Sequence, residues 1–150
     1  MTQVLRIRNE LAFNLPSLDS IMRRALASDP LIVNVNEAMD EVRSRLGDER
    51  FALFVAQEDG AWTGVLLAGH GRSAFSRGCV VLHVHNEGTR QSLDAMLEAL
   101  VEYARDGGYD RIIGMDMNAK PRGFKRLFGR FSKRSRLTGE IHVFEVGDEQ

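Results

Sequence analysis

The chain has 150 residues, which is the length of one ordinary domain and enough to bury a substantial core. Its net charge of −1 does not indicate any particular class of binding partner. Its single cysteine excludes an intrachain disulfide. No apolar run approaches the ~20 residues of a membrane span, and the first residues lack the apolar core of a signal peptide. We therefore expect a soluble cytoplasmic protein, although proteins of viral particles share this composition.

The first part of the chain carries one strand signal and two helix signals. Residues 4–8 alternate in polarity and predict a short strand. Ser17 is the predicted N-cap of a helix that ends before Pro30, because the residue preceding a proline avoids the helical region. Asn36 is the predicted N-cap of a second helix, and Gly47 its stop.

A hairpin and a long connection are predicted next. Residues 51–56 and 61–68 have the composition of strands, and Glu58-Asp59-Gly60 between them is a strong hairpin signal. Residues 69–78 are rich in glycine, so we expect them to form a long connection.

Residues 79–118 form the centre of the predicted fold. The apolar run at 79–85 indicates a strand in which Cys79 is a small core residue. A helix follows, with apolar residues at the spacing i, i+3, i+4, i+7, i+8 and i+11: Leu93, Met96, Leu97, Leu100, Val101 and Ala104. Gly107-Gly108 ends this helix, and residues 111–118 predict a buried strand. Two such strands in one sheet are expected to be parallel, with a right-handed crossover.

The last part of the chain is strongly basic. A helix with Phe124, Leu127, Phe128 and Phe131 on its apolar face is predicted, and a final strand at 139–146. Eight of the twenty Lys and Arg residues lie from Lys120 to Arg136, with no acid among them. This run has three interpretations: it holds coenzyme phosphates, it binds nucleic acid or an acidic protein surface, or it is a solvated helix face.

The element order β-α-α-β-β-β-α-β-α-β predicts one α/β (α+β) domain over residues 1–150, with a mixed central sheet flanked by helices. This order resembles the GNAT superfamily of acetyl-CoA-dependent N-acyltransferases. Residues 95–112 look like the family's long helix and return strand, and 124–128 look like the following helix. The resemblance implies transfer of an acetyl group from acetyl-CoA to an amine of a small molecule or a protein.

The resemblance also implies where acetyl-CoA binds. It places the coenzyme beside the central strand, its pyrophosphate at the start of the long helix, and an orienting asparagine at the end of the return strand. The residues concerned are Leu82, Val84, Gly88, Thr89, Arg90, Gln91, Ser92 and Asn118. The alternative for residues 88–92 is a plain strand-to-helix turn.

The chain departs from the family at two motifs. The family's pyrophosphate loop reads Gln/Arg-x-x-Gly-x-Gly/Ala. In this chain Gln91 and Leu93, or Leu93 and Ala95 when the motif is started at Arg90, stand where the glycines would be. Many members also carry a tyrosine as general acid on the helix after the asparagine, where this chain has Phe124 and Phe128.

Three residues near the end of the central strand are candidates for catalysis. His83 and His85 lie two positions apart and therefore share a face, and either imidazole could accept a proton from an amine. Glu87 is a second candidate base at the mouth of the strand. The alternative is that both histidines are ordinary sheet residues. A metal site would need a third ligand, which nothing nearby specifies.

The sequence therefore supports two alternative functions. The first is a GNAT-like N-acyltransferase whose amine substrate enters near Glu87 and residues 69–78. The second is a non-catalytic GNAT-like binding or assembly module that has lost coenzyme binding, for example in a viral particle or a regulatory complex. Both a monomer and an oligomer are compatible with the sequence.

Overall fold

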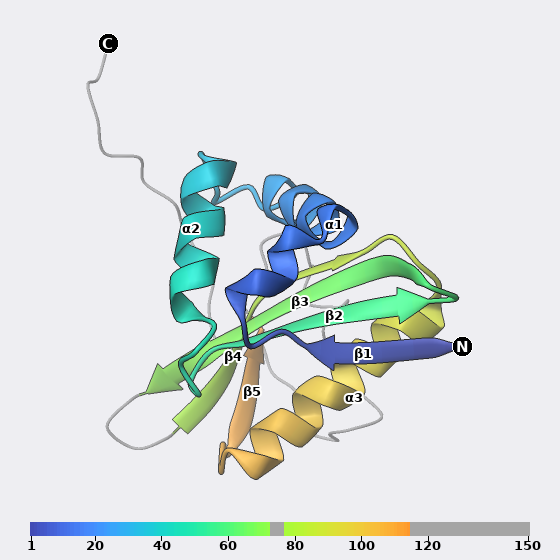
Figure 1. Ribbon diagram of the computed structural model, residues 1–150. Coiled ribbons are helices and arrows are strands. Elements are labelled where there is room, and N and C mark those ends of the chain that lie inside the picture. The colour runs from blue at the N-terminus through green and yellow to red at the C-terminus, as the bar shows by residue number, and fades with distance from the viewer. Residues whose placement is uncertain (73–76, 115–150) are drawn as a thin grey trace, which may run out of the picture.

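The computed structural model describes residues 1–72 and 77–114 (Figure 1), and in these ranges a mixed sheet lies between helical layers. The strands lie in sequence order across the sheet: β1 (Thr2–Arg6), β2 (Ala52–Glu58), β3 (Ala61–Arg72), β4 (Arg77–Asn86) and β5 (Arg111–Gly114). Neighbours from β1 to β4 are antiparallel, and β5 runs parallel to β4. The predicted parallel pair around the central helix is confirmed.

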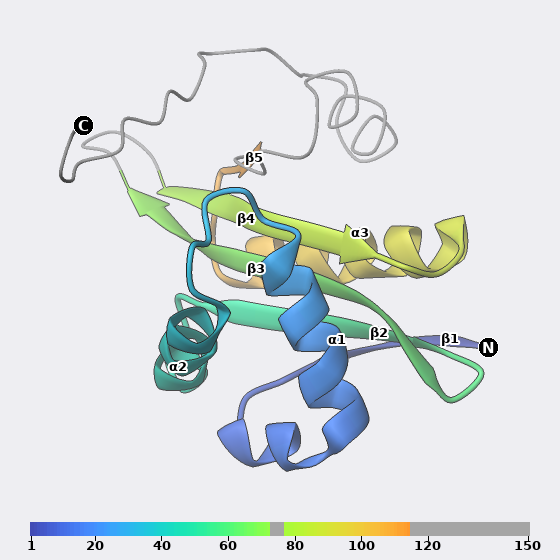
Figure 2. The same cartoon turned by 90° about the horizontal axis from the view of Figure 1, so that it is seen from above.

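Helices cover both faces of the sheet. On one face lie the 3-10 helix η1 (Glu10–Asn14) and the helices α1 (Pro16–Ala27) and α2 (Val35–Arg45), and on the other lies α3 (Arg90–Asp106). Seen from above, α1 lies in front of the strands and α3 behind them (Figure 2). Neither described range contains a helix long and apolar enough to cross a membrane.

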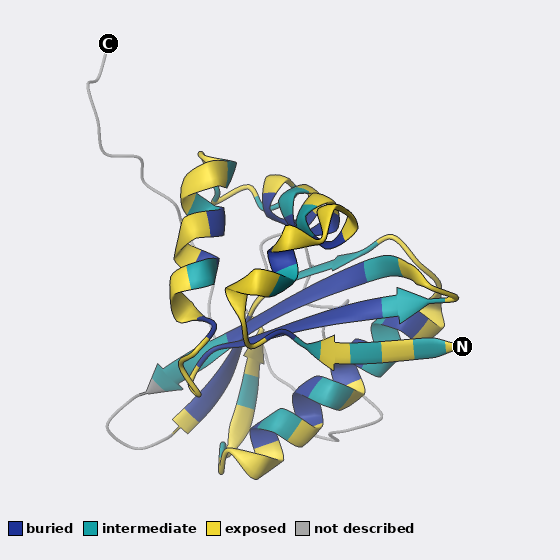
Figure 3. Ribbon diagram, viewed as in Figure 1, coloured by how far each residue is buried: buried dark blue, intermediate teal, exposed yellow. Residues whose placement is uncertain are grey.

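Successive residues of β2 point to opposite faces and enter two different cores. Leu53 and Val55 pack with α1 and α2, whereas Phe54 and Ala56 pack with α3. A strand covered on both sides has no solvent-facing positions, which is why residues 51–56 are a continuous apolar run. Figure 3 shows the buried centre of the sheet and the exposed outer faces of the helices.

The central helix follows its predicted pattern. Five of the six stripe residues are buried, and Leu93 packs half-buried against the same cluster. Cys79 is fully buried in that cluster, so its prediction as a core residue is confirmed. Burial raises the pKa of the Cys79 thiol to about 11.

The turn between β2 and β3 is the predicted hairpin. Asp59 has φ 49° and Gly60 has φ 86°, so both residues lie in the left-handed region. Two such residues in a two-residue loop are typical of a type I′ turn, whose twist matches that of the flanking strands.

Both predicted N-caps are wrong. Leu15, not Ser17, caps α1, because Pro16 takes the first helical position, which suits its fixed φ and its missing N–H. Asn34, not Asn36, caps α2, and its side chain accepts the N–H of Glu37. The Asn36 side chain instead accepts a hydrogen bond from Arg23 Nη1 at 2.7 Å.

The predicted long connection at 69–78 is mostly strand, because β3 extends to Arg72 and β4 begins at Arg77. The glycines make room for neighbouring side chains. A Cβ on Gly71 would lie 2.6 Å from Val80 Cγ2, and one on Gly78 would lie 2.5 Å from Ile113 Cδ1. Glycine within a strand marks such a close approach. Asn118, the basic run, the predicted last helix and the last strand lie outside the described residues.

Candidate functional site

The two candidate histidines lie on the α1 side of β4. His83 pairs with Leu67 and His85 with Val65, while Ala68 pairs with Val81. Leu82 therefore has no partner on β3, and this bulge lies directly before the histidines. The predicted shared face of His83 and His85 is confirmed, since both reach Ser28 at the end of α1.

His83 is buried, with only 1% of its surface exposed. Its Nε2 lies 2.8 Å from Ser28 Oγ and 2.9 Å from the carbonyl oxygen of Ala25. Its Nδ1 lies 3.9 Å from Asp29 Oδ2. These contacts join β4 to the C-terminal end of α1 and favour a structural role for His83.

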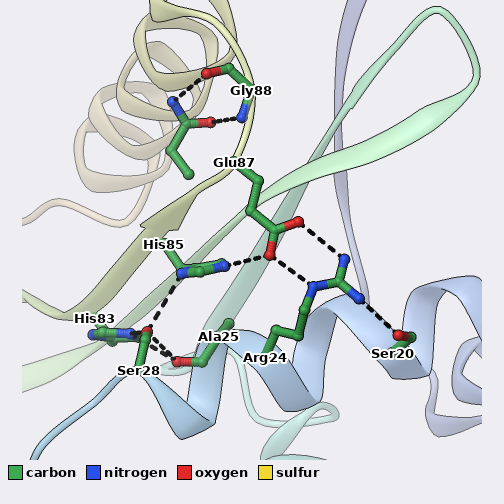
Figure 4. A network of polar contacts seen from close by, with 9 residues as sticks. Ser20, Arg24, Ala25, Ser28, His83, His85, Glu87 and Gly88 are labelled. Atoms are coloured by element: carbon green, nitrogen blue, oxygen red, sulfur yellow. Dashed lines mark hydrogen bonds and ion pairs between the residues drawn. The ribbon is translucent and has the colours of Figure 1, made fainter.

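His85 is more accessible and belongs to a wider polar network (Figure 4). Its Nε2 lies 2.7 Å from Glu87 Oε2, and its Nδ1 lies 3.4 Å from Ser28 Oγ. Arg24 of α1 donates through Nε to Glu87 Oε2 at 2.8 Å and through Nη2 to Oε1 at 3.0 Å. Its Nη1 donates to Ser20 Oγ at 2.7 Å. The network thus links α1 to the end of β4.

The network fixes the charge of Glu87. Hydrogen bonds from Arg24 and His85 lower the pKa of Glu87 to about 2, and the bond to Glu87 raises the pKa of Arg24. Glu87 is therefore ionised at neutral pH and takes up protons poorly. An ionised carboxylate only accepts hydrogen bonds, so His85 donates to it from Nε2, and in the neutral ring the lone pair is then on Nδ1.

The turn at residues 88–92, predicted to hold pyrophosphate, carries a carboxylate of the chain itself. The Thr89 N–H donates to Glu58 Oε1 at 2.8 Å, and the Thr89 hydroxyl donates to Glu58 Oε2 at 3.0 Å. Arg90 Nε donates to Asp94 Oδ1 at 3.2 Å. Ser92 is buried, and its hydroxyl lies 2.9 Å from Thr63 Oγ1. Gln91 is exposed.

Asn86 and Gly88 shape this turn. The Asn86 side chain accepts the Gly88 N–H at 3.2 Å and donates to the Thr89 carbonyl at 3.1 Å. A Cβ on Gly88 would overlap Glu58 Oε1 and lie 2.7 Å from Thr63 Cβ. Glycine at this position therefore allows Glu58 to reach Thr89.

The described residues test one part of the predicted acetyl-CoA site, the turn at 88–92. The described part of β5 pairs with β4 only as far as Val81–Gly114, while β4 continues to Asn86. Leu82 and Val84 lie beyond the last of these pairs, and the residues that follow Gly114 lie outside the described part of the chain. The turn at 88–92 does not fit pyrophosphate as it stands, because carboxylates hold Thr89 and Arg90.

A surface pocket of about 250 Å³ lies beside the network, lined by Ser17, Ser20, Arg24, Gly60, Ala61 and Trp62. Trp62 Nε1 donates to Ser17 Oγ at 3.1 Å across it. Arg24 both lines this pocket and binds Glu87, so the pocket is joined directly to the polar network.

Sequence reasoning missed Arg24, Ser28 and Glu58. Arg24 lies 63 positions from Glu87, and Ser28 lies 57 positions from His85. Neither contact has a signal in local spacing. Glu58 was interpreted only as part of a hairpin turn, since its contact with Thr89 also depends on the fold.

No protein-family model matches the chain, and no curated protein matches it. Several solved structures, however, are similar to the chain. A probable acetyltransferase superposes with a TM-score of 0.72 at 13% identity, covering 98% of this chain and 99% of its own. A predicted acetyltransferase from Clostridium acetobutylicum with acetyl-CoA gives 0.67 at 14% identity, covering 96% of each chain. A transcriptional regulator from Bacillus halodurans C-125 gives 0.68 at 16% identity, covering 95% of this chain and all of its own (100%).

These similarities show that the chain has the fold of the GNAT acetyltransferases. The predicted mixed sheet flanked by helices in a single α/β domain is confirmed.

Proposed function

We propose that the protein is an N-acyltransferase of the GNAT type, which transfers an acetyl group from acetyl-CoA to the amine of a small molecule or a protein. The observation that carries this proposal is the His85–Glu87 pair at the end of β4, held by Arg24 within a fold shared with acetyltransferases.

The chemistry needs a group that removes a proton from the amine. In the reaction a C–N bond forms at the thioester carbonyl of acetyl-CoA, the C–S bond breaks, and coenzyme A leaves as a thiolate that takes up a proton from water. We assign the amine proton to His85 Nδ1, because imidazole exchanges protons near neutral pH. Glu87, ionised and bonded to His85 Nε2, orients the ring and stabilises its charged form. His83, buried against Ala25, supports the end of α1.

We place the acceptor in the pocket lined by Ser20, Arg24 and Trp62. This pocket offers hydroxyl groups and an aromatic surface, and Arg24 joins it to Glu87. His85 does not line this pocket, and its Nδ1 is directed toward Ser28 (Figure 4), so an acceptor held there needs an arm that carries its amine past Arg24 to His85.

The test measures thiol release from acetyl-CoA with a panel of small amines and peptides. His85→Gln is expected to lower kcat by about 10²–10⁴-fold. Glu87→Gln should lower it less, because it removes only the group that orients His85. His70→Gln is the matched control, since His70 pairs with Cys79 at the other end of β4. Equal losses in His85→Gln and His70→Gln would contradict the assignment.

The second candidate is a non-catalytic binding or assembly module with the same fold. Two observations favour it, the Glu58 carboxylate on Thr89 and the pairing of Arg90 with Asp94. Calorimetric titration with acetyl-CoA separates the candidates, because a module that has lost coenzyme binding gives no heat and no thermal shift at millimolar ligand.

In the second candidate the basic run from Lys120 to Arg136 contacts an acidic protein or nucleic acid. Retention of the protein on DNA or RNA over a salt series tests this contact. Retention that does not weaken with salt would exclude phosphate contacts by the run.

A further inference from the structure

We propose that Glu58 is an internal anion that competes with the pyrophosphate of the donor, so that acetyl-CoA binds fully only after Glu58 leaves Thr89. This inference rests on the proposed acyltransfer function. It assigns to Glu58 a control over donor affinity that the family's loop pattern does not contain.

Both oxygens of Glu58 are committed to one residue. Oε1 accepts the Thr89 N–H at 2.8 Å, and Oε2 accepts the Thr89 hydroxyl at 3.0 Å. Glu58 is the last residue of β2, and Thr89 is the residue before α3. A carboxylate at this end of a helix is stabilised by the aligned peptide dipoles, as a phosphate would be.

The surrounding residues are shaped for this carboxylate. Gly88 has no Cβ, and any Cβ there would overlap Glu58 Oε1. On the other side, the Thr63 and Ser92 hydroxyls lie 2.9 Å apart and hold β3 against the first turn of α3. The turn at Gly88, the strand at Thr63 and the first turn of α3 thus surround one space, and the Glu58 carboxylate occupies it.

Charge makes the two occupants exclusive. A pyrophosphate on the Thr89 N–H would stand within contact distance of a carboxylate, and like charges that close repel. Arg90, the basic residue next to Thr89 in the sequence, donates its hydrogen bond to Asp94. However, 57% of the Arg90 side chain is exposed, so its guanidinium has room to turn toward a phosphate. Glu58 lies beside the exposed hairpin tip at Asp59, where its carboxylate can be solvated after release.

The consequence is a two-state equilibrium at Thr89. In one state Thr89 holds Glu58, and in the other it holds the donor. The apparent affinity for the donor is then reduced by the fraction of molecules in which Thr89 is available. Removing the charge of Glu58 should raise that fraction and leave the part of the site along β4 unchanged.

The experiment compares Glu58→Gln with the unmodified protein by calorimetric titration. Asp59→Asn is the matched control, because it removes one charge from the adjacent residue and asparagine tolerates the positive φ of Asp59. The probes are acetyl-CoA and S-acetyl-pantetheine, which has the same arm without phosphates. Glu58→Gln should bind acetyl-CoA about tenfold more tightly, with the affinity for S-acetyl-pantetheine unchanged. Asp59→Asn should change neither affinity.

Two results would overturn the inference while leaving the proposed function intact. One is equal acetyl-CoA affinity in the unmodified protein and Glu58→Gln. The other is an equal gain for S-acetyl-pantetheine, which would place the effect away from the phosphates. If neither protein binds acetyl-CoA, the proposed function fails, and this inference fails with it.

A second measurement does not depend on the variant. The Thr89 amide resonance in a ¹⁵N-labelled protein should shift when acetyl-CoA is added, because its acceptor changes from carboxylate to phosphate. Binding of acetyl-CoA with an unshifted Thr89 amide would show that the pyrophosphate lies elsewhere.

For the calorimetric comparison, circular dichroism and thermal melting establish that Glu58→Gln remains folded.

Discussion

Glu87 is the residue whose ionisation the fold changes most directly at the site. Its pKa falls from an ordinary value near 4.5 to about 2, first because Arg24 donates to it and then because His85 does. A depressed carboxyl pKa contributes stability that is present above the unfolded pKa and lost as pH falls toward the folded pKa. The stabilising effect of Glu87 should therefore disappear between about pH 4.5 and pH 2.

Glu87→Gln tests this directly. At pH 7 the variant should be less stable than the unmodified protein by on the order of 1 kcal/mol, a modest figure because solvent screens the partly exposed pair. The difference should shrink steadily on acidification, because the unmodified protein then loses the same interaction. Urea unfolding at a series of pH values gives the free energies. A difference that stays constant down to pH 2 would contradict the assigned ionisation.

Cys79 is predicted to be chemically inert in the folded protein. It is fully buried, and burial raises its thiol pKa to about 11. Two pKa units above the ordinary value near 9 correspond to about a hundredfold less thiolate at pH 8. A chromogenic disulfide reagent should therefore label Cys79 only in denaturant. Labelling of the native protein at the rate of a free thiol would show that this part of the sheet opens readily.

At the scale of single elements, the β2–β3 hairpin depends on its turn. Gly60 has φ 86°, and an alanine there would carry the left-handed penalty of about 1–2 kcal/mol. Gly60→Ala should lower stability by that amount in a urea titration. Gly47→Ala is the matched control, because a Cβ at Gly47 meets no atom within 4 Å and its φ is not in the left-handed region. Equal effects of the two substitutions would exclude turn strain as the cause.

The elements that could be predicted from the sequence are those set by local pattern. The apolar stripe of α3 and the Asp59-Gly60 turn follow from spacing and residue type alone. The N-cap of α2 does not, since Asn34 and Asn36 are equally suitable by type. In the structure Asn34 caps the helix, whereas the Asn36 side chain accepts a hydrogen bond from Arg23 of α1, a contact that local sequence does not show.

The length of β3 and β4 was missed for a similar reason. Gly71 and Gly78 favour a loop when only the sequence is considered. In the sheet they lie under Val80 and Ile113, whose side chains occupy the space that a Cβ would need. The meaning of these glycines is set by residues of neighbouring strands, so it becomes visible only when the strand register is known.

In the candidate site, too, contacts between residues close in sequence could be predicted, whereas contacts between distant segments could not. The end of β4, with His85 and Glu87, was predicted because its residues are close in sequence. Arg24 comes from α1, and the contact of Glu58 with Thr89 joins the end of β2 to the start of α3. Both contacts need the helices to be docked on opposite faces of the sheet. The chemistry of the strand end was thus predictable, whereas its electrostatic control was not.

At the scale of the whole molecule, one sheet separates two cores and connects them. Ile21 lies in the cluster under α1 and α2, and Leu97 lies in the cluster under α3. Alternate residues of β2 and β3 belong to each cluster, so neither core keeps its inner wall if the sheet is lost. The polar network lies on the α1 side of this sheet, where Arg24 of α1 binds Glu87 in the segment between β4 and α3.

This arrangement predicts a single cooperative unfolding transition in the full chain. Trp62 packs against the α1 cluster and Tyr103 against the α3 cluster, so tryptophan fluorescence and the tyrosine near-ultraviolet signal report different faces. Ile21→Ala and Leu97→Ala should each lower the unfolding free energy by about 2–5 kcal/mol, because both side chains are fully buried. Each substitution should move both signals to the same new midpoint, although it changes only one core. A variant in which one signal moves and the other stays would mean that the two faces unfold separately, and that α1 can leave β4 without disturbing α3.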